Sequence, residues 1–159
     1  MYIGKLNINS EKQTKSIANN LYQLSKIGDI FALYGNIGVG KTTFARHFIN
    51  GAVDKQNISS PSYNIYFIYE SIKAPIFHMD AWRLKSGFDI LNLGISDYFN
   101  EAIFLIEWAN KIESHLPSNK LKVKLEYNEN IRTLTFDGDE TWKKRLENKF
   151  SRDLIDKNY

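Results

Sequence analysis

Apolar residues along this chain gather in short runs, and stretches with helical spacing separate the runs. Three of the runs are rich in Ile, Phe and Leu and have the length of buried strands: residues 30–34, 76–80 and 102–107. A helix is expected from about Lys41 to Asn50, where Gly51 ends it. Strands that alternate with helices in this way predict an α/β fold with a central, largely parallel sheet flanked by helices.

The segment before the first run carries the signals of a helix start and a helix stop. Ser10 and Gln13 have the spacing of a capping box, with Ser10 at the N-cap and Gln13 at position N3. Apolar residues follow on one helical stripe: Ile17, Leu21 and Leu24. Gly28 is expected to stop this helix.

Further strands are expected outside the three apolar runs. Residues 63–69 have the composition of a strand that follows the loop Ser59–Ser62. Residues 121–127 alternate apolar and charged side chains, turn at 128–130 and return as 131–136. This pattern predicts a β-hairpin with one face in water.

From Thr141 onward, apolar residues again recur at helical spacing: Trp142, Leu146, Phe150 and Leu154. Basic residues surround them: Lys143, Lys144, Arg145, Lys149 and Arg152. Two interpretations of this tail helix, residues 141–159, stay open. In the first, the apolar stripe packs on the sheet and the basic side chains form a solvated face. In the second, the basic side chains form a surface for RNA or for an acidic patch of a partner.

Composition limits the class of protein. The chain has 159 residues, 43% of them hydrophobic and 14% aromatic, which suits one domain, residues 1–159, with a sizeable core. It has no apolar run near the ~18–20 residues that span a bilayer, and no secretory signal is visible. Cysteine is absent, which excludes disulfides and thiolate metal sites. The net charge of +3 permits an acidic partner without requiring one. We expect a cytoplasmic protein that does not enter membranes.

The segment Gly35–Thr42 matches the phosphate-binding pattern G-x-x-x-x-G-K-[ST], and it lies between a predicted strand and a predicted helix, as the pattern requires. Glycines allow backbone N–H groups to curl around phosphate oxygens, and the helix N-terminus adds a positive dipole. Lys41 is expected to contact the β- and γ-phosphates, and Thr42 to offer its hydroxyl to Mg²⁺. The sequence therefore predicts a site for ATP and Mg²⁺, with nucleotide contacts from Ile37, Gly38, Val39, Gly40, Lys41, Thr42 and Thr43.

Two acidic residues end apolar runs and are candidates for chemistry beside the metal ion. Glu107 follows four apolar residues, as in a Walker B strand, and strand carboxyl ends face the ligand crevice in open α/β sheets. The alternative is a solvated glutamate that merely closes a core strand. Asp80 ends another run and could orient the attacking water or a metal-bound water. His78 shares a strand face with Asp80, and we interpret it as packing against or orienting that carboxylate.

Several further motifs occur in a fixed order with the glycine-rich loop: Ser60-Pro61-Ser62-Tyr63, His78-Met79-Asp80, Trp82-Arg83-Leu84, Gly94-Ile95, Asp97-Tyr98-Phe99 and Glu107-Trp108. Together they closely resemble the bacterial TsaE family over about residues 10–136. The resemblance implies a P-loop ATPase that supports the synthesis of threonylcarbamoyladenosine in tRNAs that read ANN codons. It also implies TsaD and TsaB as partners, with tRNA met indirectly through that complex and the threonylcarbamoyl transfer left to TsaD.

The resemblance also implies roles for single residues. Lys41 and Thr42 match the family's phosphate and magnesium residues. Glu107 matches its second magnesium-associated acid, and Asp80 matches an acid needed for hydrolysis. We therefore take Lys41 and Asp80 as catalytic and Thr42 and Glu107 as metal-associated.

Three further positions are implied by the same resemblance. Trp108 adjoins the nucleotide, and Arg132 falls about where the family has a basic contact to it. Ser62 is a departure, because the family usually has threonine there. Serine keeps the hydroxyl, so a catalytic role in positioning water or sensing the metal is expected to survive.

Three other classes of function also involve a nucleotide-binding loop. A GTPase needs a D-x-x-G switch, and no aspartate of this sequence is followed three residues later by glycine. A small-molecule P-loop kinase usually needs an arginine-lined lid, and the five arginines do not cluster in the sequence: Arg46, Arg83, Arg132, Arg145 and Arg152. A nucleotide-gated binding module with negligible turnover also stays open, because the output of a slow ATPase can be partner binding.

Overall fold

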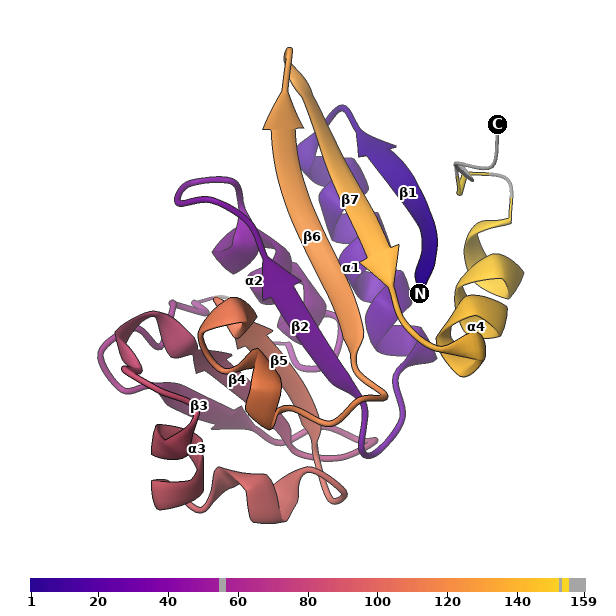
Figure 1. The fold of residues 1–159 in the computed structure, drawn as a ribbon. Helices are drawn as coiled ribbons and strands as arrows, with labels where there is room; N and C mark the ends of the chain where they lie inside the picture. Colours follow the sequence, from indigo (N-terminus) through magenta and orange to yellow (C-terminus); the bar gives the residue numbers. More distant parts are fainter. Residues whose placement is uncertain (55–56, 152, 155–159) are drawn as a thin grey trace.

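The structure is a computed structural model that describes residues 1–154 except 55, 56 and 152. Within these residues the strands form one seven-stranded sheet with the order β1-β7-β6-β2-β5-β4-β3 (Figure 1). The strands are β1 (Tyr2–Ile8), β2 (Ile30–Tyr34), β3 (Tyr66–Tyr69), β4 (Ile76–Asp80), β5 (Ile103–Glu107), β6 (Leu121–Asn128) and β7 (Ile131–Asp137). The α-helices are α1 (Glu11–Leu24), α2 (Lys41–Asn50), α3 (Phe88–Asn92) and α4 (Glu140–Phe150). Short 3₁₀ helices are η1 (Ala81–Arg83), η2 (Ile95–Tyr98), η3 (Ala109–Lys111) and η4 (Glu113–His115).

The centre of the sheet is parallel and its margins are antiparallel. Strands β6, β2, β5 and β4 run in one direction, whereas β3, β7 and β1 pair antiparallel to their neighbours. The α/β class and the parallel centre predicted from the sequence are thus confirmed. Three of these strands, β2, β4 and β5, are buried on both faces, which is why their sequences are nearly continuous apolar runs. Strand β6 instead alternates buried and more exposed residues.

Alternate residues of the central strands face two separate cores. One core, under α1 and α2, contains Phe31 and Leu33 of β2; the other, on the opposite face, contains Ile30 and Ala32. Helix α3 and the short helices near it cover the second core, away from α1 and α2 (Figure 1). The polar end of β4 lies on the first face, because Asp80 follows Ile76 at an even spacing.

Residues at the ends of several helices and strands explain where these elements begin or end. Ser10 caps α1: its hydroxyl accepts from the Gln13 N–H at 3.3 Å, and the Gln13 side chain accepts from the Asn9 N–H at 2.7 Å. The predicted bounds of α2 and of its stop at Gly51 are confirmed. The hairpin is confirmed as well, and two residues with positive φ, Glu129 and Asn130, form its tight turn.

The structure differs from the sequence-based expectation at two strands. The strand expected from Tyr63 begins only at Tyr66, because Ile65 has a left-handed backbone (φ 69°) that interrupts an extended chain. Strand β1 was not expected, and it pairs with β7 at the margin of the sheet. A register shift between Tyr2 and Gly4 makes its pattern irregular, and the buried residues do not alternate as in a regular strand: Ile3, Gly4, Leu6 and Ile8.

The tail helix packs on the sheet, as the first of the two interpretations predicted. Trp142 contacts the ring of Phe31 with centroids 5.2 Å apart, and its Nε1 donates to the Asn119 carbonyl at 2.8 Å. The expected solvated face is wrong for Arg145, whose guanidinium lies 3.8 Å from the Trp142 ring and is hydrogen-bonded to Asp29. Helix α4 ends at Phe150, and the rest of the predicted tail helix at 152 and 155–159 lies outside the described residues.

None of the helices among the described residues combines the length and apolar character needed to cross a membrane.

Candidate functional site

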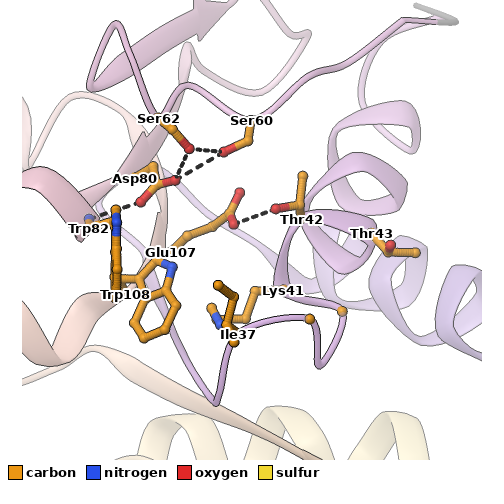
Figure 2. A pocket seen from close by; sticks show the side chains of 12 residues that line it. Ile37, Lys41, Thr42, Thr43, Ser60, Ser62, Asp80, Trp82, Glu107 and Trp108 are labelled. Carbon is orange, nitrogen blue, oxygen red and sulfur yellow. Dashed lines mark hydrogen bonds between the residues drawn. The ribbon is translucent and has the colours of Figure 1, made fainter.

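A pocket of about 410 Å³ lies where the carboxyl ends of β4 and β5 meet the start of α2 (Figure 2). In the register of the parallel strands, Glu107 is opposite Leu33 on one side and Asp80 on the other. The sheet therefore brings the two predicted carboxylates side by side. The pocket is lined by Ile37, Gly38, Gly40, Lys41, Thr42, Thr43, Ser60, Ser62, Asp80, Trp82, Glu107 and Trp108.

The glycine-rich loop presents bare backbone to this pocket. Gly38 and Gly40 have φ of 74° and 112°, which side-chain-bearing residues rarely adopt, and a Cβ at either position would point into open space. Gly40 is the N-cap of α2, and no side chain of the described residues caps that helix end. The first N–H groups of a helix lack partners within the helix. The start of α2 is therefore suited to an anionic ligand.

Lys41 is held inside the loop. Its Nζ donates to the carbonyls of Gly35 at 2.7 Å and Asn36 at 2.9 Å, and it lies 3.8 Å from the ring centroid of Trp108. Only 5% of the residue is exposed. This burial lowers the pKa of Lys41 from its usual value, and the nearby charge of Glu107 partly opposes the shift.

Glu107 joins the glycine-rich loop to the strand beside it. Its Oε2 accepts from the Thr42 hydroxyl at 2.7 Å, and its Oε1 lies 2.8 Å from Nε2 of His78. The carboxylate is only 2% exposed, so the alternative of a solvated strand end is wrong. The interpretation of His78 also needs correction, because the ring contacts Glu107 and not Asp80. The reason is that β5 lies beside β4 in parallel register, so the side chain of Glu107 reaches the His78 ring on the face that they share.

Asp80 is held mainly by the loop that follows α2. Its Oδ2 accepts from the hydroxyls of Ser62 at 2.6 Å and Ser60 at 3.0 Å, and the two hydroxyls lie 2.9 Å apart. Its Oδ1 accepts from the Trp82 N–H at 2.9 Å. Figure 2 shows Ser60, Ser62 and Asp80 on the side of the pocket opposite the glycine-rich loop.

Aromatic rings form one wall of the pocket. Trp108, which has a left-handed backbone (φ 55°), lies over Lys41, and its ring centroid is 4.4 Å from that of Trp82. Thr43 reaches the pocket from the first turn of α2.

Arg132 lies apart from this pocket. It lines an adjoining hollow of about 660 Å³ between the glycine-rich loop and the β6–β7 hairpin, together with Tyr127 and the near-buried Val39. The guanidinium carbon is 5.5 Å from the Tyr127 ring centroid. This hollow shares Ile37 and Gly38 with the first pocket. Arg132 also lines a smaller hollow that shares Gly38, Gly40 and Thr43 with the first pocket.

Sequence reasoning missed three features of this site. The sequence predicts a loop at Ser60 but indicates no role for its hydroxyl, although it lies two residues from Ser62. The Trp82 N–H cannot be recognised, because backbone donors leave no mark in a sequence. The link between His78 and Glu107 depends on strand register, and a pattern within one strand cannot reveal it.

The site offers oxygen ligands of the kind that Mg²⁺ prefers. A hydroxyl that donates its proton to a carboxylate, as Thr42 does to Glu107, keeps its lone pairs for a cation. The described residues contain no cluster of three or more His, Cys, Asp or Glu side chains able to hold a metal ion by themselves. Mg²⁺ is commonly bound through one or two protein oxygens and the phosphates of a nucleotide. The donor set fits that mode.

Comparison with known proteins gives one consistent result. The family model described as "Threonylcarbamoyl adenosine biosynthesis protein TsaE" matches residues 8–134. The tRNA threonylcarbamoyladenosine biosynthesis protein TsaE of Rickettsia prowazekii (strain Madrid E) is 38% identical over 128 residues, which cover 80% of this chain and 89% of that protein. The protein of the same name from Bacillus subtilis (strain 168) is 34% identical over 116 residues, or 72% of each chain. The crystal structure of Bacillus subtilis YdiB is similar with a TM-score of 0.77 and 29% identity, over 96% of this chain and 97% of that one. The chain therefore belongs to the TsaE family of tRNA threonylcarbamoyladenosine biosynthesis.

Proposed function

We propose that this chain binds ATP with Mg²⁺ and hydrolyses it slowly, in support of tRNA threonylcarbamoyladenosine synthesis by TsaD and TsaB. One observation carries the proposal: the phosphate-binding sequence pattern, the Thr42–Glu107 pair and the Asp80–Ser62 pair converge on one pocket. Each of these groups suits a different part of a nucleotide–metal complex.

The glycine-rich loop and Lys41 form the phosphate-binding part of this proposal. The ammonium of lysine has three N–H donors, and two of them are used by the carbonyls of Gly35 and Asn36. The third remains for a phosphate oxygen. The N–H groups at the start of α2 add donors and the positive end of the helix dipole.

Thr42 and Glu107 would hold Mg²⁺, Thr42 through its hydroxyl oxygen and Glu107 directly or through a water. When bound, the ion supplies positive charge that offsets the charge of the phosphates. The role of the protein is to keep both oxygens in place before the ligand arrives. Glu107 is suited to that role because it is buried and bonded on both sides.

Asp80 and Ser62 form the hydrolytic part. A carboxylate offers about four lone-pair positions, and Asp80 uses three of them for Ser60, Ser62 and the Trp82 N–H. The remaining one can accept a hydrogen bond from a water and orient it toward the γ-phosphate. Ser62, at the rim of the same pocket, is the hydroxyl that would sense the γ-phosphate.

The partners in this proposal come from the family. The relatives are described as tRNA threonylcarbamoyladenosine biosynthesis proteins, and we assign this chain to the same process in the cytoplasm. Its ATPase would drive repeated turnover of a complex with TsaD and TsaB, and the threonylcarbamoyl transfer would belong to TsaD. Contact with tRNA would be indirect.

The test has two arms. Titration calorimetry of the purified chain with ATP, in Mg²⁺ and in EDTA, should show tighter binding with the metal, and a phosphate-release assay should show slow hydrolysis that the partners stimulate. Affinity purification from cells should recover TsaD and TsaB homologues. Absence of ATP binding in Mg²⁺ contradicts the nucleotide part; transfer of phosphate to a nucleoside instead of water favours the kinase alternative.

A further inference from the structure

His78 is a fully buried polar side chain to which the proposed mechanism gives no task. The residue lies in the middle of β4 and has no exposed surface, yet its Nε2 is 2.8 Å from Glu107 Oε1. Glu107 ends the neighbouring strand β5, so the contact crosses two parallel strands of the core. Burying a polar ring in a strand centre costs free energy unless its hydrogen bonds are made. An apolar residue would fill this space without that cost.

The hydrogen-bond partners indicate which ring nitrogen carries the proton. An ionised carboxylate only accepts hydrogen bonds, so Nε2 of His78 must donate to Glu107. The other nitrogen, Nδ1, has no partner among the described residues. A buried N–H without an acceptor is costly, whereas a bare ring nitrogen lacks only a weaker interaction. The geometry therefore favours a neutral ring with its hydrogen on Nε2.

The two oxygens of Glu107 are divided between two donors. Oε1 accepts from His78, and Oε2 accepts from the Thr42 hydroxyl at the start of α2. The terminal torsion of a free glutamate rotates with little preference. A donor on each side fixes that torsion and keeps Oε2 on the Thr42 side of the pocket.

The neighbouring carboxylate does not compete for the ring. Asp80 lies on the same strand face as His78 but is bonded to Ser60, Ser62 and the Trp82 N–H. The ring is thus free to serve Glu107 alone.

We propose that His78 is a positioning residue that holds the Glu107 carboxylate, through the Nε2–H···Oε1 hydrogen bond, in the orientation that binds Mg²⁺ together with Thr42. This inference rests on the proposed function, since it concerns how the metal part of the pocket is preorganised. Partners of this kind, which orient a metal-binding side chain without touching the metal, typically change metal affinity 10- to 100-fold.

The test compares three variants by the affinity for a fluorescently labelled ADP, measured in Mg²⁺ and in EDTA. His78→Leu removes the donor and keeps an apolar side chain of similar size. His78→Gln returns an N–H donor at about the reach of Nε2. Met79→Leu is the matched control, because Met79 is equally buried on the same strand but faces the other core.

Mg²⁺ should raise the affinity of the parent for labelled ADP, and we expect this increase to be roughly tenfold smaller in His78→Leu. The affinity of His78→Leu in EDTA should match that of the parent. His78→Gln should recover most of the gain, and Met79→Leu should keep all of it. An unchanged gain in His78→Leu overturns the inference, and so does an equal loss in Mg²⁺ and EDTA, which marks a residue that only fills the core. A parent chain that gains nothing from Mg²⁺ contradicts the proposed function itself.

A second measurement needs no variant and so does not depend on folding of the mutants. Nitrogen-15 NMR of the histidine rings in the unaltered protein identifies the protonated nitrogen. Hydrogen on Nε2 of His78 is the expected result. Hydrogen on Nδ1 removes the donor to Glu107 and overturns the inference.

Discussion

Asp80 and Glu107 are neighbours in the register of β4 and β5, but they are held in different ways. Glu107 is bonded to residues of regular elements, Thr42 in α2 and His78 in β4. Asp80 is bonded mainly to hydroxyls of a loop and to the N–H that follows its own strand: Ser60, Ser62 and Trp82. Both carboxylates are buried, so the contrast lies in their partners and not in their exposure.

This contrast divides the pocket into a part of fixed geometry and a part that depends on a loop. Helices and core strands open only with much of the global unfolding free energy, whereas loops open locally at lower cost. The loop also contains Ile65, a β-branched residue at φ 69°, and such a backbone costs of order 1–3 kcal/mol. The proposed metal site at Glu107 and Thr42 should therefore be preformed, and the proposed hydrolytic site at Asp80 should respond to the ligand.

The largest effect is expected at Lys41, in the phosphate-binding part of the pocket. Lys41→Ala should abolish ATP hydrolysis and lower ATP affinity, because a charge-assisted contact to phosphate is worth about 1.5–3 kcal/mol, or roughly 10- to 150-fold. Titration calorimetry and phosphate release measure the two quantities. Lys144→Ala is the control, since Lys144 is exposed in α4 and lines none of the three hollows around the glycine-rich loop. Hydrolysis at the parent's rate in Lys41→Ala would show that the loop is not a phosphate site.

The next effect tests the contrast directly. Glu107→Ala should weaken nucleotide binding in Mg²⁺ but not in EDTA, and it should lower the melting temperature because the donors on Thr42 and His78 lose their acceptor. Asp80→Ala should leave binding largely intact and depress hydrolysis. Glu107→Gln and Asp80→Asn keep the size of each side chain and separate loss of charge from loss of packing. If the two alanine variants change nucleotide affinity and hydrolysis in the same way, Glu107 and Asp80 do not have the separate roles that we propose.

A smaller effect is expected in the loop. Ser62→Ala loses a hydroxyl that donates to Asp80 Oδ2, a contact worth about 1 kcal/mol, so turnover should fall several-fold. Ser62→Thr, which keeps the hydroxyl, should match or exceed the parent, and ADP affinity should hardly change in either variant. Ser60→Ala is the matched comparison: its hydroxyl donates to the same oxygen at the longer distance of 3.0 Å, so this variant should lower turnover less than Ser62→Ala does. If Ser62→Ala hydrolyses ATP at the parent's rate, both alone and with TsaB and TsaD, the loop has no role in hydrolysis and only connects α2 to β3.

The smallest effect concerns pH. Burial lowers the pKa of Lys41 below its usual value of 10.5, and the charges of Glu107 and Asp80 oppose the shift. Phosphate prefers the protonated ammonium, so ATP affinity should be highest below this lowered pKa and decline as the pH rises through it. Calorimetry at increasing alkaline pH measures the decline, and Lys41→Ala should not show it. A decline of equal size in that variant would assign the titration to another group.

The sequence predicted those elements that are determined by residues close together in the chain. Strands β2, β4 and β5 are buried on both faces, so their apolar runs could be recognised directly, and Gly51 gave the end of α2. Strand β1 could not be recognised, because a marginal strand with Gly4 lacks a clean alternation. The start of β3 was misplaced, because the conformation of Ile65 is imposed by its surroundings and not by its side chain.

The same division applies to the site. Lys41 and Thr42 lie within one motif, and Glu107 and Asp80 end apolar runs, so the sequence could single out all four. Contacts such as those of Glu107 with Thr42 and His78 join positions far apart in the chain and depend on register. Arg132 was assigned through family resemblance alone, and it lies in the adjoining hollow.

The contact between Trp82 and Trp108 has a spectroscopic consequence. The chain has three tryptophans, and two of them share the pocket wall, while Trp142 is 2% exposed on the buried face of α4. The emission of the pocket pair should respond to a ligand beside Lys41, and the emission of Trp142 should shift to longer wavelength only when the core opens. A Trp142→Phe chain would therefore report occupancy of the pocket, and a chain with Trp82→Phe and Trp108→Phe would report unfolding. Ligand binding and global stability can thus be followed separately in this protein without any attached dye.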